Sequence, residues 1–245
     1  MNSNGSEAFL KRNNPLILAL DVDTADAALT LAKRLEGRLG AIKIGPRLAM
    51  RYGSDLVGKL AQSAPIFVDN KYLDIPNTME AAVRATFDAG ATFTTVHAWA
   101  GPEALARLAK VEAELNSRRP FKILVVTILT SFNSETLPPG MAREPLATHV
   151  SMLADLALAS GLSGIVCSSH EVELLRKKSA QAFLVVPGIR LPSDAAGDQK
   201  RIETPETAIR QGASALVVGR PIYEAVDPVQ AAENVQQSIR AGAQS

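Results

Sequence analysis

Residues 66–97 read IFVDNKYLDIPNTMEAAVRATFDAGATFTTVH. An apolar run at 66–69 is followed by a helix-like, alanine-rich segment that ends at a glycine, and then by a second β-rich run at 93–97. Strands that are apolar almost throughout are buried on both faces, as in parallel sheets. Glycine is the usual residue just past the end of a helix. This stretch therefore predicts one strand–helix–strand unit of a parallel sheet.

The same unit recurs along the chain. The predicted strands are residues 16–20, 41–44, 66–69, 93–97, 122–129, 164–167, 183–186 and 215–218. Eight such units fit a closed barrel. A doubly wound open sheet is the alternative, but it normally has a glycine-rich turn after its first strand, and LALDVDTADA at 18–27 contains no glycine. We predict an α/β fold, a (β/α)8 TIM barrel, as one catalytic domain at 15–245 after a polar N-terminal extension at 1–14.

The composition is that of an ordinary globular protein. The chain is 47% hydrophobic and 21% charged, with a formal net charge of +1 and 4% aromatic residues. Near-neutral charge and few aromatic residues argue against nucleic acid or membrane partners. The single cysteine, Cys167, excludes an intramolecular disulfide and favours a reducing compartment. Because the polar N-terminus also lacks the apolar core of a signal peptide, we expect a cytoplasmic protein.

Polar residues follow most of the predicted strands. In a (β/α)8 barrel the active site lies at the C-terminal ends of the strands. The candidates there are Asp21, Asp23, Lys43, Asp69, Lys71, His97, Thr130, Ser131, Arg190 and Arg220. This clustering predicts a catalytic barrel.

The densest of these groups surrounds Asp69. In an extended strand Asp69 and Lys71 project to the same face, and Lys43 alternates with two isoleucines that would pack outward. Two ammonium groups and a carboxylate would then share a confined site, and a lysine held beside carboxylates stays protonated and suits a general acid. The alternative is a surface ion pair, with Asp74 capping the next helix.

Six ordered segments carry a family resemblance. The segment DNKYLDIPNT at 69–78 resembles the D-x-K-x-x-D-I-P-N-T signature of the orotidine 5′-monophosphate decarboxylase family. The other similar segments are LALDVD (18–23), IKIG (42–45), TILTS (127–131), VVPGIRLPSDAAGDQKRIETP (185–205) and LVVGRPI (216–222). The D-x-K-x-x-D core alone would be less specific, because sugar-phosphate decarboxylases and aldolases of the same superfamily share it.

The resemblance implies a chemistry for the charged group. The family converts orotidine 5′-monophosphate to uridine 5′-monophosphate and CO2, the last step of de novo pyrimidine synthesis, with no metal or other cofactor. Lys71 would stabilise and protonate the C6 carbanion, and Asp69 would hold Lys71 and face the substrate carboxylate. Lys43 and Asp21 would contact the ribose hydroxyls and complete the alternating charge array, and Asp74 would belong to the same catalytic array across a dimer.

The resemblance also implies how the nucleotide is bound and how subunits assemble. Arg190, Gln199, Gly219 and Arg220 would bind the phosphate, and Thr130 and Ser131 the pyrimidine. The loop at 188–203 would close over the ligand. Asp74, Ile75 and Thr78 would reach the active site of a neighbouring subunit, which implies a homodimer.

Two positions depart from the family pattern, and two other functions stay open. Leu73 stands where many members have histidine, and Trp99 stands where small residues are more usual. One alternative function is a metal-dependent sugar-phosphate decarboxylase or aldolase of the same superfamily, which would use Mg2+. The other is a non-catalytic phosphate-binding barrel. The three histidines show no metal-ligand spacing, so no metal is expected.

Overall fold

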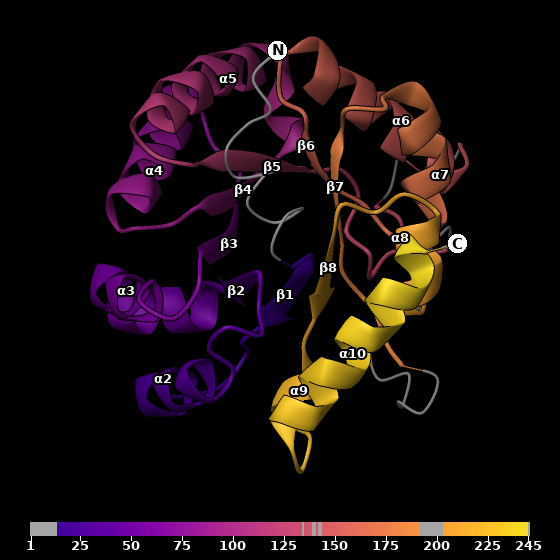
Figure 1. The fold of residues 1–245 in the computed structure, drawn as a ribbon. Helices are drawn as coiled ribbons and strands as arrows, with labels where there is room; N and C mark the ends of the chain where they lie inside the picture. Colours follow the sequence, from indigo (N-terminus) through magenta and orange to yellow (C-terminus); the bar gives the residue numbers. More distant parts are fainter. Residues whose placement is uncertain (1–13, 134, 139–140, 142–143, 192–202, 245) are drawn as a thin grey trace.

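The computed structural model describes residues 14–133, 135–138, 141, 144–191 and 203–244. Within them strands and helices alternate along the chain (Figure 1). The strands are Leu16–Ala19 (β1), Ala41–Ile44 (β2), Ile66–Tyr72 (β3), Phe93–His97 (β4), Lys122–Val126 (β5), Gly164–Val166 (β6), Phe183–Val186 (β7) and Ala215–Val218 (β8). They pair in parallel in chain order, and β8 pairs with β1, so the sheet is closed. The predicted (β/α)8 barrel is confirmed, and the open doubly wound sheet is wrong.

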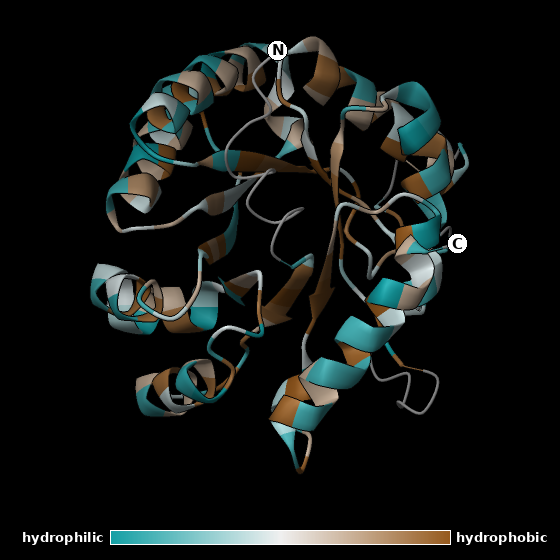
Figure 2. Cartoon of the chain, viewed as in Figure 1, coloured by the Kyte–Doolittle hydropathy of each residue, from teal (hydrophilic) through white to brown (hydrophobic). Residues whose placement is uncertain are grey.

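Helices surround the barrel (Figure 1). They are Ala25–Arg34 (α2), Pro46–Leu60 (α3), Pro76–Asp88 (α4), Ala98–Ala100 (η1), Gly101–Arg118 (α5), Leu146–Ala159 (α6), Ser169–Lys178 (α7), Pro205–Arg210 (α8), Arg220–Tyr223 (α9) and Pro228–Ala243 (α10). Several begin with proline in the first turn, where its missing N–H costs nothing. Strands such as β1 and β8 are hydrophobic, whereas helices such as α10 carry both hydrophilic and hydrophobic residues (Figure 2). No helix in the described part of the chain is long and apolar enough to cross a membrane.

Two layers of apolar side chains follow from strand alternation. Phe67, Phe93 and Phe183 belong to a cluster inside the barrel, where the rings of Phe93 and Phe183 stack with centroids 6.1 Å apart. Ile42 and Ile44 belong to the larger cluster between the strands and the helices. Because side chains alternate along a strand, the residue between these isoleucines faces the barrel interior.

The predicted strand limits hold at most positions, with two notable differences. Strand β5 ends at Val126 rather than at residue 129. Strand β3 continues past residue 69 to Tyr72 because Tyr72 still pairs with Val96 of β4. Of the predicted N-terminal extension at 1–14, only Asn14 lies within the described residues.

Candidate active site

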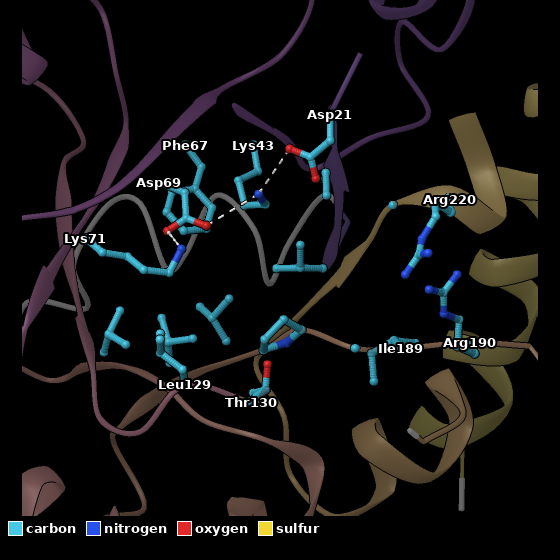
Figure 3. A pocket seen from close by; sticks show the side chains of 18 of the residues that line it. Asp21, Lys43, Phe67, Asp69, Lys71, Leu129, Thr130, Ile189, Arg190 and Arg220 are labelled. Atoms are coloured by element: carbon cyan, nitrogen blue, oxygen red, sulfur yellow. Dashed lines mark hydrogen bonds and ion pairs between the residues drawn. The ribbon is translucent and has the colours of Figure 1, made fainter. Parts of the chain in front are cut away.

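A cavity of about 450 Å³ opens at the C-terminal ends of the strands. Its size is that of a small-molecule site. Residues from or just after seven of the eight strands line it, and Figure 3 shows their side chains converging on one space. Seven of the ten predicted polar residues line this cavity, and the other three, Asp23, His97 and Ser131, do not.

Four charged groups of alternating sign line one side of this cavity. The Lys43 ammonium lies 3.4 Å from Asp69 Oδ2 and 3.9 Å from Asp21 Oδ1. The Lys71 ammonium donates to Asp69 Oδ1 over 2.9 Å. The four groups thus form a row in the order Asp21, Lys43, Asp69, Lys71 (Figure 3). The predicted contact between both lysines and Asp69 is present, rather than a surface pair.

Asp69 is the buried centre of this row. Burial by itself would raise the pKa of its carboxyl, but the ammonium groups of Lys43 and Lys71 outweigh burial and hold the pKa below its usual value. Opposite charges at this distance favour the ionised form of an acid. A fixed negative charge therefore lies between the two lysines.

The backbone at Lys71 differs from the extended strand that the sequence predicts. The pairing of β3 with β4 shifts between Val68 and Tyr72, so four residues of β3 span the same length as two of β4. Lys71 has a φ of 51°, and it is the single non-glycine residue with positive φ in the described part of the chain. A bulge, and not simple alternation, therefore brings Lys71 to the same side as Asp69.

Two arginines lie beyond the Asp21 end of the charged row (Figure 3). Arg190 follows β7 and is 8% exposed, and Arg220 begins α9 directly after Gly219. Their guanidinium groups point toward one another (Figure 3), and all three residues line the cavity. Planar guanidinium forks match the oxygens of a phosphate.

The predicted phosphate loop is described at its two ends. Arg190 N–H donates to the carbonyl of Glu203, and Ile189 bridges to Glu203 in parallel. This pairing holds the two ends of the loop together beside the arginines. Gln199 lies outside the described residues, as does the rest of 192–202.

The segment predicted to bind a pyrimidine is only partly in the cavity. Thr130 lines it, whereas Ser131 is exposed and does not. The apolar residues Ile128, Leu129 and Pro187 also line the cavity, and they offer an apolar surface that a flat ring could contact. Sequence reasoning missed these apolar residues, although their places directly after β5 and β7 could have indicated them.

Asp74, Ile75 and Thr78 lie outside this cavity. All three are exposed, Ile75 to 66%, and Asp74 Oδ1 accepts a hydrogen bond from the N–H of Ile75. None of them lines the space occupied by Lys71 and Asp69. Their predicted role is therefore not one within the cavity of their own chain.

In the parts of the chain that the structure describes, no three His, Cys, Asp or Glu side chains converge as a metal site would require. The Lys43 ammonium lies between Asp21 and Asp69, in the space between carboxylates where a divalent cation would have to sit. An ammonium there repels such a cation.

The fold and the cavity define a (β/α)8-barrel enzyme site for a small anionic substrate. A family model described as the orotidine 5′-phosphate decarboxylase / HUMPS family matches residues 14–235, and the chain belongs to this family. An orotidine 5′-phosphate decarboxylase of Dichelobacter nodosus is 41% identical over 229 residues, covering 93% of this chain and 99% of the relative. One of Rhodopseudomonas palustris is 45% identical over 226 residues, covering 91% and 94%. The crystal structure of orotidine 5′-phosphate decarboxylase from Lactobacillus acidophilus superposes with a TM-score of 0.81 at 35% identity, covering 93% of this chain and 99% of that one.

Proposed function

We propose that this protein decarboxylates orotidine 5′-monophosphate to uridine 5′-monophosphate and CO2, the last step of pyrimidine nucleotide synthesis. It is a carboxy-lyase, and its curated relatives are named orotidine 5′-phosphate decarboxylases. The observation that carries the proposal is the row Asp21–Lys43–Asp69–Lys71 along a cavity that has two arginines beyond the Asp21 end of the row. The charged row would act at the reacting carbon, and the two arginines would bind the 5′-phosphate.

Lys71 carries the proton chemistry in this proposal. When the bond between C6 and the carboxylate breaks, CO2 leaves and its bonding electron pair stays on C6, in an orbital in the plane of the ring. The ring π system delocalises that pair poorly, so a nearby fixed charge must stabilise it. The Lys71 ammonium stabilises the carbanion, donates its proton to C6 and is reprotonated from solvent.

The other members of the row position Lys71 and the ribose. Asp69 accepts a hydrogen bond from Lys71 Nζ over 2.9 Å and so fixes its direction. The Asp69 charge also faces the substrate carboxylate, and their repulsion is relieved as CO2 leaves. Lys43 and Asp21 lie farther along the row toward the arginines (Figure 3), where the ribose hydroxyls would be bound.

The rest of the nucleotide supplies binding energy. Arg190 and Arg220 bind the phosphate dianion, with Gly219 offering its backbone at the start of α9. Thr130 contacts the pyrimidine beside the apolar wall, and Ser131 is assigned to the same turn by resemblance. Gln199, from the loop at 188–203, is assigned to the phosphate by resemblance.

The active protein is a homodimer in this proposal. Asp74, Ile75 and Thr78 serve the site of the neighbouring subunit, which is consistent with their exposure outside their own cavity. Leu73, directly after β3, is 54% exposed, and Trp99, in η1 after the neighbouring strand β4, is 50% exposed. Contact with a second copy would cover these apolar side chains.

Two other functions fit the site less well. A metal-dependent sugar-phosphate lyase would need a cation close to the carboxylates that Lys43 already contacts. A non-catalytic phosphate-binding barrel would use the two arginines, but it has no need of Lys71 held against a buried carboxylate. We also infer that the protein is cytoplasmic and that it needs no cofactor.

One assay tests the proposal. Purified protein is mixed with orotidine 5′-monophosphate and EDTA, and the loss of the orotate absorbance is followed. We expect turnover that EDTA does not reduce, abolished in Lys71→Ala and retained in Lys59→Ala, a control at an exposed lysine of α3. No turnover by the unmodified protein contradicts the function, and full turnover by Lys71→Ala contradicts the mechanism.

A further inference from the structure

The hydroxyl of Thr95 makes contacts inside the charged row that none of the roles above accounts for. Thr95 lies in β4 and is 1% exposed. Phe93, two residues before it, belongs to the cluster inside the barrel, so alternation directs Thr95 inward as well. Its Oγ1 donates to Asp69 Oδ1 over 2.9 Å and accepts a hydrogen bond from the backbone N–H of Lys71 over 2.9 Å.

The second contact holds an unusual backbone conformation. Left-handed φ values such as the 51° of Lys71 are unfavourable for an L-residue and persist only where the surroundings enforce them. The ladder between β3 and β4 is shifted at this point. The Thr95 hydroxyl takes the Lys71 N–H where a regular ladder would offer a backbone carbonyl.

The first contact orients the carboxylate. Asp69 Oδ1 accepts from both Thr95 Oγ1 and Lys71 Nζ, while Oδ2 faces Lys43. A hydroxyl can donate one hydrogen bond and accept another at the same time. One atom therefore links the backbone of the proton donor to the side chain that directs its ammonium group.

We propose that Thr95 is a positioning residue for Lys71: its hydroxyl holds the left-handed backbone of Lys71 and the orientation of the Asp69 carboxylate. This inference rests on the proposed decarboxylation. Thr95 itself does not touch the substrate in this scheme. Its loss should therefore affect the chemical step far more than binding.

The test compares Thr95→Val, Thr95→Ser and Thr94→Val in the orotidine 5′-monophosphate assay. Valine keeps the shape of threonine but loses the hydroxyl, and serine keeps the hydroxyl. Thr94 is the matched control, since its fully buried hydroxyl donates to the Val68 carbonyl. We expect Thr95→Val to lower kcat about 10- to 100-fold through misplacement of the reacting group. The KM of Thr95→Val should stay within about threefold of that of the unmodified protein. The kcat values of Thr95→Ser and Thr94→Val should also stay within about threefold of the unmodified value.

A pH profile separates positioning from a general loss of stability. The Thr95 hydrogen bond favours the ionised form of Asp69 and lowers its pKa. Removing it should raise that pKa, so the acid limb of the kcat/KM profile should move to higher pH in Thr95→Val but not in Thr94→Val. If Thr95→Val does not fold, Thr95→Ala removes the same hydroxyl without adding bulk and is measured in its place.

Three results would overturn the role of Thr95. They are an unchanged kcat in Thr95→Val, an equal loss in Thr95→Ser, or an equal loss and an equal shift of the acid limb in Thr94→Val. Each result is compared with the turnover of the unmodified protein in the same assay. If the unmodified protein is inert, the proposed function fails together with the inference; if it is active and Thr95→Val matches it, the inference fails alone.

Discussion

Asp69 contacts both lysines of the site, and its ionised form should stabilise the folded protein. Its folded-state pKa lies below the ordinary value of 3.8 because Lys43 and Lys71 outweigh the effect of burial. A lowered pKa gives stability that is present above the unfolded value and is lost as the pH falls through the folded one. We therefore expect Asp69→Asn to lower the free energy of unfolding by about 1–3 kcal/mol at neutral pH. This difference from the unmodified protein should shrink as the pH falls from about 5 to about 3.

Urea unfolding of both proteins across this pH range measures the effect. Asp23→Asn is the control, since the Asp23 side chain is 78% exposed in a surface pair with Arg47 and should change stability by at most about 1 kcal/mol. A difference between Asp69→Asn and the unmodified protein that stays constant with pH would contradict the lowered pKa of Asp69.

Arg220 should matter only when the substrate has a phosphate. Arg220→Ala removes charge-assisted hydrogen bonds, so we expect kcat/KM for orotidine 5′-monophosphate to fall about 10- to 100-fold. With orotidine, which lacks the phosphate, the same variant should equal the unmodified protein. Steady-state kinetics with both substrates measures this, and Arg210→Ala, in a half-exposed pair with Glu206, is the control. An equal loss with orotidine would place the role of Arg220 elsewhere.

Individual residues also mark the limit of what the sequence predicts. Lys43 could be placed because one strand alternation sets the direction of its side chain. The bulge at Lys71 could not be predicted, since the local sequence NKY contains no glycine to indicate a left-handed residue. Thr95 was missed for a different reason: threonine is a common strand former, and only pairing with β3 shows what its hydroxyl contacts.

At the scale of elements, buried strands were predictable and their outer ends less so. Runs such as FLVV and ALVV became β7 and β8 with the predicted limits, because a strand buried on both faces must be apolar along its length. The end of β5 was placed three residues too late. Ile128 and Leu129 are apolar like the strand, but they line the cavity and do not extend the sheet.

Two glycines in helices should respond to alanine in opposite directions. Gly58 lies in α3 with open space where a Cβ would be added, so Gly58→Ala should stabilise the protein by about 0.5–1 kcal/mol through helix propensity. Gly242 lies near the end of α10, where an added Cβ would overlap the backbone carbonyl of Glu206 in α8. Gly242→Ala should cost about 1–3 kcal/mol.

Urea unfolding of the two alanine variants measures this pair of effects, and each serves as the control for the other. The packing of α10 on α8 would be looser than described if Gly242→Ala were as stable as the unmodified protein. Neither position lines the cavity, so turnover should be unchanged in the folded variants.

At the scale of the whole molecule, the signature segment divides between two places. Asp69 and Lys71 line the cavity of their own barrel, whereas Asp74 is exposed outside it. If Asp74 completes the site of a second copy, one working site needs Lys71 from one chain and Asp74 from the other. A C2 dimer then holds two such sites related by symmetry.

Mixing two inactive variants tests this arrangement. We expect Lys71→Ala and Asp74→Ala each to be inactive alone, and an equal mixture after subunit exchange to recover about a quarter of normal activity, since half of the dimers are mixed and each has one intact site. Mixing Lys71→Ala with Asp69→Ala is the matched control and should recover nothing, because those residues belong to the same cavity and every mixed site lacks one of them. Turnover with orotidine 5′-monophosphate is the measurement, and native mass spectrometry verifies the exchange. If exchange is complete and the first mixture stays inactive, Asp74 does not serve the neighbouring site.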